Sequence, residues 1–343
     1  MLKRNSVPVT TIFLITCLFL LFLADSVSSE TAIRDTFVRQ ISRYIWHYDY
    51  YNAIDNARAI VVNEPQNPVG YFLLGTVYQT ISEEYRTDRF KDSVTYLLDK
   101  AIALAEERID SDPDNPDWHF ITGAGHGYRA LHRAFHGNWW GAFKDGFQCS
   151  SHLERTLELD STLYDAYLGL GAYHYWKTIK SKIFLWLPFV SDRREQGIEE
   201  IIKAAEQGYL STYNARESLL RVYLTEGRYA EMLRLADSLA ELNPGDPYCL
   251  LYQAQGLMAV GRLDEAEGKL RMLRAAWKKS PYYDPFGFYE AEYLAAEIFY
   301  QKGDKEAARK IIDKIISDSS MRKANAYFAE TLDKAESLAK KLR

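Results

Sequence analysis

The stretch "EPQNPVGYFLLG" at residues 64–75 returns as "DPDNPDWHFITG" at residues 112–123. A weaker copy, "DSTLYDAYLGLG", occupies residues 160–171. Each copy ends on a glycine, and the three glycines lie 48 residues apart in both intervals. A constant interval of this length is typical of stacked structural repeats, in which each unit buries its apolar face against its neighbours.

Each copy predicts a turn, an Asp or Asn that caps a helix, and a helix with apolar residues at helical spacing. Gly75, Gly123 and Gly171 stand at the same place in the three helices, where the absence of a side chain lets a neighbouring helix approach closely. We therefore predict an all-α fold, an α-solenoid of about seven stacked antiparallel helix pairs. The segment at residues 325–343 is amphipathic and predicts a C-terminal capping helix.

The repeat interval shortens in the second half of the chain. Gly227 and Gly261 each precede an amphipathic helix and lie 34 residues apart, and Gly303 begins a third copy. The earlier units are 14 residues longer, which is about seven residues, or two turns, for each helix of a pair. We expect elongated repeats over residues 30–210 and ordinary repeats with the capping helix over residues 211–343, continuous with the first part.

The motif in the first helix of these units resembles that of the tetratricopeptide repeat (TPR) family, W-x2-L-G-x2-Y. Tyr71, Leu74, Gly75 and Tyr78 match it with one aromatic exchange. The chain looks like an exported bacterial-type TPR protein with enlarged N-terminal repeats. The resemblance implies a scaffold that binds an extended peptide or a helix of a protein partner in a concave groove lined by the first helices.

The resemblance maps positions that face the groove onto aromatic residues and one acidic residue. They are Phe72, Phe120, Tyr128, Asp165, Tyr175 and Trp176. Aromatic side chains bury much area with few rotatable bonds and therefore suit a binding surface. An aromatic stripe at helical spacing is also typical of a core, and we favour the core for Phe72 and Phe120. For Tyr175 and Trp176 both interpretations stay open.

An alternative function is a small-ligand or metal-binding protein that uses the aromatic and histidine-rich region 118–176. His132 with His136 and Cys149 with His152 form two pairs at spacings that metal ligands can have. Imidazole and thiolate groups both bind zinc, so the two pairs could together form a tetrahedral site. We favour the competing interpretation, in which histidines pack between helices, because His126 and His174 occupy the repeat position of Tyr78. The sequence otherwise has no catalytic or cofactor-binding motif, so we expect no enzyme and no cofactor.

Two further apolar elements have two interpretations each. The paired tryptophans of "NWWG" at residues 138–141, in an expected turn, either close the end of a helix pair or form an exposed anchor. The apolar run 183–187 is either a tip packed over the long helices or a surface that contacts a membrane.

The first 29 residues have the layout of a secretory signal peptide, with Lys3 and Arg4 before an apolar run at residues 12–23. We expect an exported, periplasmic or extracytoplasmic protein, with an uncleaved N-terminal anchor as the alternative.

Cys149 and Cys249 then remain as two distant cysteines, which we expect to be buried free thiols. The formal net charge of −5, without a long block of one sign, argues against nucleic acid or anionic lipid as the main partner, because both favour clustered Lys and Arg. Membrane contact is expected only through the N-terminal segment or residues 183–187.

Overall fold

The structure, a computed structural model, describes residues 38–180 and 191–343. The expected signal peptide and the apolar run 183–187 lie outside these residues. The chain divides by its internal contacts into two units, Met1–Asn56 and Ala57–Arg343. In the first unit, residues 38–46 are helical, and the first half of α2 (Tyr50–Asn63) follows them.

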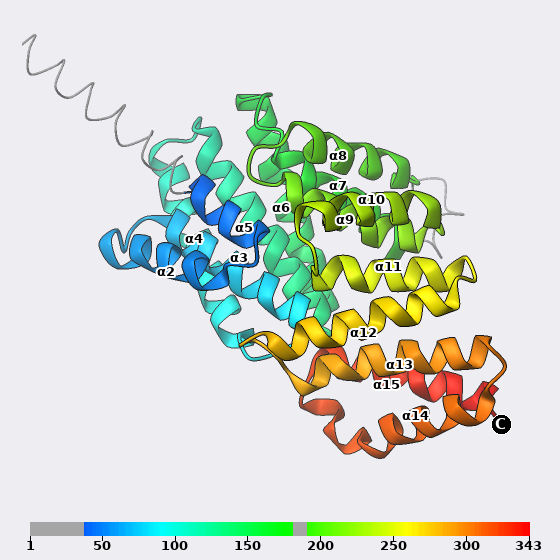
Figure 1. The fold of residues 1–343 in the computed structure, drawn as a ribbon. Coiled ribbons are helices and arrows are strands. Elements are labelled where there is room, and N and C mark those ends of the chain that lie inside the picture. Colours follow the sequence, from blue (N-terminus) through cyan, green and yellow to red (C-terminus); the bar gives the residue numbers. More distant parts are fainter. Residues whose placement is uncertain (1–37, 181–190) are drawn as a thin grey trace, which may run out of the picture. The chain divides into compact units, whose positions relative to one another are not determined.

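The second unit is built from consecutive helices joined by short turns (Figure 1). After α2 they are α3 (Pro68–Tyr85), α4 (Lys91–Ser111), α5 (Pro116–Phe135), α6 (Trp139–Leu159), α7 (Ala166–Lys180), α8 (Arg194–Gln207), α9 (Thr212–Thr225), α10 (Tyr229–Leu242), α11 (Pro247–Ala259), α12 (Leu263–Lys279), α13 (Pro285–Gln301), α14 (Lys305–Ser317), the 3₁₀ turn η2 (Ser319–Lys323) and α15 (Ala326–Lys341).

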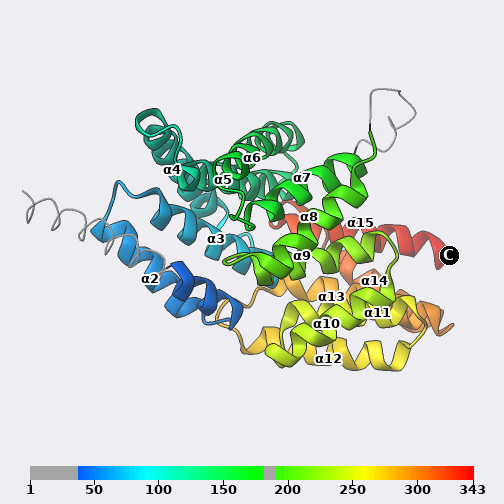
Figure 2. The same ribbon diagram turned by 90° about the horizontal axis from the view of Figure 1, so that it is seen from above.

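The helices pack as antiparallel pairs, from α3 with α4 to α13 with α14, and the second helix of each pair packs on the first helix of the next. Figure 1 shows α11, α12 and α13 lying side by side in this way, and Figure 2 shows α4, α5 and α6 doing the same. Helix α15 covers both α13 and α14. The prediction of an all-α stack of helix pairs with a C-terminal capping helix is therefore confirmed.

The predicted caps start several first helices. The Asn67 side chain accepts a hydrogen bond from the Val69 backbone N–H (3.0 Å), and Asn115 accepts one from Asp117 (3.0 Å). In both cases proline follows the cap as the first helical residue, where its missing N–H costs nothing.

The repeated glycines lie where helices of a pair come closest. A Cβ atom at Gly75 would lie 3.1 Å from Leu98 Cδ2, and one at Gly123 would lie 2.8 Å from Leu153 Cγ. At Gly171 it would lie 2.5 Å from the backbone oxygen of Gly197, so two glycines face each other between α7 and α8. This confirms the role predicted for the repeated glycines.

Helix lengths differ along the chain. Helices α4 and α6 have 21 residues and α5 has 20, whereas α9 and α10 have 14 and α11 has 13. The predicted difference between the two halves is not uniform, because α8, which lies within residues 30–210, has 14 residues like α9 and α10. Helices α12 and α13, with 17 residues each, are longer than the second-half repeats were expected to be.

The C-terminal end of α3 contacts helices much later in the chain. The indole N–H of Trp277 in α12 donates to the Glu84 backbone oxygen (3.1 Å), and the Thr87 hydroxyl donates to Asp284 Oδ2 (2.6 Å). The Asn325 side chain donates to the Arg86 backbone oxygen (2.8 Å). The stack thus curves far enough for its first pair to meet its last helices. Among the described helices none is both long and apolar enough to cross a bilayer.

Candidate functional site: the inner face

Side chains from four first helices meet where the stack curves back on itself. Arg221 of α9 donates from Nη2 to Glu83 Oε2 of α3 (3.0 Å) and to the Tyr248 hydroxyl of α11 (3.2 Å). Asn214 of α9 donates from Nδ2 to the Tyr128 hydroxyl of α5 (3.0 Å). We call the surface formed by Glu83, Tyr128, Asn214, Glu217, Arg221 and Tyr248 the inner face.

Aromatic rings surround the polar groups of the inner face. The Arg221 guanidinium lies 5.7 Å from the ring centre of Phe135, within the range of a cation–π contact. The Tyr248 ring lies 4.8 Å from that of Tyr252. The Tyr128 ring meets Phe72 edge to face at 6.0 Å. The site therefore combines one cation and several carboxyl groups with a wall of large rings.

The charges of the inner face are out of balance. Burial opposes the charge of Arg221, but Tyr248, Tyr252 and Glu83 together hold its pKa well above the ordinary value. Burial raises the pKa of Glu217 well above its ordinary value, and the negative charges of Asp246, Glu84 and Glu83 raise it further. The positive charge of Arg221 is the main effect that lowers the pKa of Glu217. Glu217 would thus be stabilised in its charged form by a further cation.

Burial also changes the pKa of Tyr128 on the inner face. It raises the pKa of Tyr128 to about 12, although the hydrogen bond from Asn214 lowers it in part. Tyr128 is therefore a neutral phenol at physiological pH, and its side chain stays partly accessible to solvent.

The structure separates the residues predicted to face a groove. Phe72 is buried beside Tyr128, and Phe120 packs against the core of Cys149, Leu153, Ala166 and Leu170. Of these three aromatic residues, Tyr128 is the one that lies on the inner face.

Asp165 and Tyr175 are held by contacts inside the chain. The buried carboxylate of Asp165 accepts hydrogen bonds from the Tyr209, Leu210 and Ser211 backbone N–H groups just before α9. Tyr175 is fully buried, and its hydroxyl donates to Glu226 Oε1 (2.9 Å). Neither side chain presents a free surface, because both connect neighbouring helix pairs. This corrects the expectation that Asp165 faces a groove, and for Tyr175 it favours the core over the groove.

Trp176 packs edge to face on Tyr175 at 5.0 Å and remains partly accessible. The apolar run that was expected to extend this region lies outside the described residues.

The inner-face residues of α9 were not predicted from the sequence, although their spacing along the helix was a usable signal. Asn214, Glu217 and Arg221 lie three and four residues apart, so they form one polar stripe on the helix. The buried residues of α9, among them Leu219 and Leu220, lie on the other side. A polar stripe on a first helix normally indicates a solvated surface, and the sequence did not show that this one meets α3 and α11.

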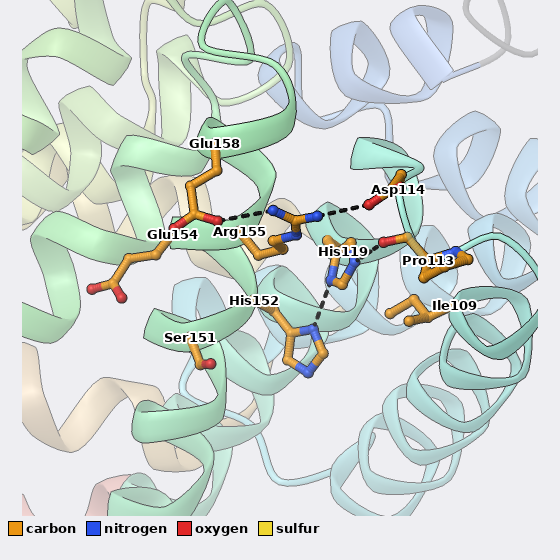
Figure 3. Close-up of a pocket in the computed structure, with 9 residues that line it drawn as sticks. All are labelled: Ile109, Pro113, Asp114, His119, Ser151, His152, Glu154, Arg155 and Glu158. Atoms are coloured by element: carbon orange, nitrogen blue, oxygen red, sulfur yellow. Dashed lines mark hydrogen bonds and ion pairs between the residues drawn. The ribbon is translucent and has the colours of Figure 1, made fainter.

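A surface cavity of about 510 Å³ lies between α4, α5 and α6 (Figure 3). It is lined by Ile109, Pro113, Asp114, His119, Ser151, His152, Glu154, Arg155 and Glu158. Arg155 bridges the Asp114 and Glu158 carboxylates at 2.7 and 3.0 Å, as Figure 3 shows.

Two histidines meet in this cavity. His119 Nε2 lies 2.9 Å from the Pro113 backbone oxygen, which can only accept, so this nitrogen carries the proton. His119 Nδ1 is then an acceptor for the His152 Nδ1–H group at 3.2 Å. Burial lowers the pKa of His152 to about 4, and the nearby His119 and His126 lower it further. His152 is therefore neutral at pH 7.

The remaining histidines take separate partners. The His132 ring bonds Gln79 Oε1 (2.9 Å), and His136 contacts Asp88 Oδ1 (3.3 Å). His126 lies 3.0 Å from the buried Asp145 carboxylate, which also binds Arg129. The two pairs at spacings that metal ligands can have do not form a metal site, because the described part of the chain contains no group of three His, Cys, Asp or Glu residues placed to hold a metal ion. His126 and His174 are buried between helices, as the packing interpretation predicts.

The paired tryptophans lie in the first turn of α6, and not in the turn before it. Asn138 accepts a hydrogen bond from the Gly141 N–H (2.9 Å) and so starts the helix before both rings. Trp139 and Trp140 are exposed, as in the anchor interpretation.

No family model and no curated relative matches this chain. Among solved structures, it is similar to YrrB, "a TPR protein with an unusual peptide-binding site", at 18% identity and a TM-score of 0.41, over 62% of this chain and 91% of that one. A tetratricopeptide repeat protein from Parabacteroides merdae ATCC 43184 matches at 17% identity and 0.40, over 88% and 98%. PilW, a "type IV pilus biogenesis factor", matches at 14% and 0.47, over 72% and 94%. At such identities and scores, the fold rests on the chain's own helix pairs.

Proposed function

We propose that this protein is a non-enzymatic scaffold that holds a peptide or a segment of a protein partner against the inner face. The observation that supports this most is Glu217. Burial and the negative charges of Asp246, Glu84 and Glu83 raise the pKa of its carboxyl group, and Arg221 is the cation that lowers it. Placing carboxyl groups together in a half-buried surface costs stability, and apolar residues would serve packing alone better. A binding role explains why the charges are kept.

The charge balance defines the segment that would bind. A Lys or Arg side chain placed near Glu217 would restore the balance, and Tyr128 would cover its aliphatic stem. The Asn214 side chain donates a hydrogen bond to the Tyr128 hydroxyl and so holds the Tyr128 ring in place. Because the ring is already fixed, little conformational entropy is lost when a partner binds. We therefore expect a basic segment.

Selection from a displayed library of random linear peptides tests the proposal. We expect the selected peptides to be enriched in Lys and Arg and to bind less tightly at high ionic strength. Glu217→Gln keeps the shape of the side chain but cannot ionise beside a bound cation, so we expect about tenfold weaker binding by calorimetry. The matched control is Glu199→Gln, an exposed position on α8. Peptides that bind the wild type and Glu217→Gln equally would exclude the inner face as the site.

We also propose that the scaffold acts outside the cytoplasm, on the strength of the N-terminal sequence. Cell fractionation and N-terminal sequencing of the purified protein test this. A chain that starts near residue 30 in the exported fraction supports cleavage, whereas an intact N-terminus in the membrane fraction supports the anchor.

The cavity at His119 and His152 favours a second candidate function, the binding of a small polar ligand. His152 presents a neutral ring to a cavity that Glu154 and Glu158 also line, so a ligand with hydrogen-bond donors fits its chemistry. The His152 ring signals can be followed by NMR while sugars, amines and zinc chloride are added. Signals that none of these compounds shifts would remove this candidate.

A further inference from the structure

The exposed aromatic residues of α6 gather on one face of its first half. Trp139, Trp140, Phe143 and Phe147 are 55, 68, 53 and 60% exposed. They are spaced by one, three and four residues, which places them along one side of the helix. We call these four residues the α6 aromatic face.

The second half of the same helix shows the contrast. The exposed residues after Phe147 are Gln148, Ser151, Glu154 and Glu158, all of them polar or acidic. A solvated outer face would be polar along its whole length, so the aromatic half has a purpose other than solvation. The rings also do not serve the core, because more than half of each lies in solvent.

Lysines accompany the aromatic rings. The Lys144 ammonium lies 5.3 Å from the Trp140 ring centre, and the Lys180 ammonium at the end of α7 lies 4.4 Å from that of Trp139. Lys177 donates to the hydroxyl of Tyr173, whose ring packs next to Gly146 of α6. The one acidic residue within this half of the helix, Asp145, is buried and bound by Arg129 and Arg133. The surface is therefore aromatic and cationic.

We infer that the α6 aromatic face binds the interface of a phospholipid bilayer that contains anionic lipids. Tryptophan and phenylalanine partition into the boundary between head groups and acyl chains, and lysine beside them attracts the phosphate groups. The charge of the surface selects this occupant over the alternatives. A second copy of the chain would bring the same lysines against each other, and the inner face offers its own site for a protein partner.

Binding to unilamellar vesicles of phosphatidylcholine, with and without phosphatidylglycerol, tests the inference by co-sedimentation of the full chain. Because residues 12–23 can bind vesicles by themselves, the comparison is made between variants that all retain them. We expect Trp140→Ser with Phe143→Ser to lower the affinity for phosphatidylglycerol vesicles by about tenfold or more. Both side chains are exposed, so the substitutions remove no core contact.

Two further variants separate the contributions. Lys144→Gln with Lys180→Gln should weaken binding to anionic vesicles and leave binding to pure phosphatidylcholine unchanged. Tyr96→Ser with Met272→Ser, which removes exposed apolar side chains from α4 and α12, is the matched control and should bind as the wild type does. Bromine-labelled lipids should quench the tryptophan fluorescence of the wild type more than that of Trp139→Ser with Trp140→Ser.

Equal vesicle binding by the wild type and the Trp140→Ser, Phe143→Ser variant would overturn the inference. So would a wild-type dimer in sedimentation that this variant abolishes, without any difference in vesicle binding, because a second copy would then be the occupant. Neither result depends on peptide binding at the inner face, so the two proposals stand or fall separately.

Discussion

Arg86 at the end of α3 and Glu290 in α13 form an ion pair, with Nε and Oε2 2.6 Å apart, between positions 204 residues apart in the sequence. Their side chains are only 12 and 17% exposed. In a stack of repeats each unit normally contacts its neighbours alone. This pair joins the first helix pair of the stack to the last, and it acts together with the Trp277–Glu84, Thr87–Asp284 and Asn325–Arg86 contacts to close the stack.

Breaking the pair should loosen that closure. Glu290→Gln leaves the Arg86 guanidinium buried without its carboxylate, and we expect the free energy of unfolding to fall by about 3 kcal/mol. Denaturant unfolding followed by circular dichroism measures it. Arg262→Ala is the control, because the Arg262–Glu265 pair on the surface of α12 is open to solvent and should contribute nothing measurable. Equal stability of wild type and Glu290→Gln would show that the closure rests on other contacts.

The same pair predicts how stability depends on pH. Burial by itself would raise the pKa of Glu290, but the Arg86 charge and hydrogen bond hold it below the ordinary 4.5. A carboxyl group with a lowered folded-state pKa stabilises the fold above the unfolded-state pKa, and this contribution is lost as pH falls through the folded-state value. The loss of stability below about pH 4.5 should be smaller in Glu290→Gln than in the wild type. Parallel unfolding curves for both proteins from pH 7 to pH 3 would contradict this assignment.

The glycine contact between α7 and α8 predicts an unusual response to alanine. In a helix Ala is favoured over Gly by about 1 kcal/mol. At Gly171, however, the added methyl group would lie 2.5 Å from the Gly197 backbone oxygen, so we expect Gly171→Ala to destabilise the protein by about 2 kcal/mol or more. Gly268→Ala in α12 is the control, since its nearest neighbour would be 3.8 Å away on the flexible Arg271 side chain, and it should raise the melting temperature. A stabilised Gly171→Ala protein would refute the contact.

The repeat fold could be predicted because its determinants are local and periodic. Gly75, Gly123 and Gly171 each act within one helix pair, so their interval reports the packing directly. The inner face could not be predicted in the same way. The contact between Glu83 and Arg221 depends on a small rotation that accumulates over several helix pairs, and no single repeat encodes that sum.

The prediction of groove residues was limited for a related reason. A motif places Tyr175 on the first helix, but it does not show that the ring fits between helices and reaches Glu226 in the next unit. Asp165 likewise holds the turn before α9, beginning 44 residues away, because its carboxylate accepts hydrogen bonds from the backbone N–H groups of that turn, and the turn has no sequence signature. From the sequence alone, a side chain that joins two repeats cannot be distinguished from one that binds a partner, because the position of the neighbouring repeat is not known.

His152 predicts a second effect of pH, at higher values than Glu290. Burial lowers its pKa from the ordinary 6.5 to about 4, so the unfolded chain binds a proton more readily than the folded one. Its contribution to stability is complete above about pH 6.5 and is lost as the pH falls toward 4, and we expect a loss of about 1–2 kcal/mol across that window, because solvent around the partly exposed ring screens the effect. NMR titration of the ring protons measures the pKa directly. A midpoint near 6.5 would show that the ring is solvated and that the contact with His119 does not form in solution.

The two cysteines of the described residues, Cys149 and Cys249, are free and buried, as the sequence analysis expects. Burial raises the pKa of the Cys149 thiol to about 12, and the nearby Asp145 adds to the effect. Burial likewise raises the pKa of Cys249, whose thiol donates to Asp246 Oδ2 (2.9 Å).

Thiolate is the reactive form, so we expect both thiols to resist a disulfide reagent in the folded protein and to react at once in guanidinium chloride. The experiment requires Cys17→Ser, so that only these two thiols are counted. Rapid reaction of either cysteine under native conditions would mean that the helices around it open readily, and the rate would then measure the free energy of that opening.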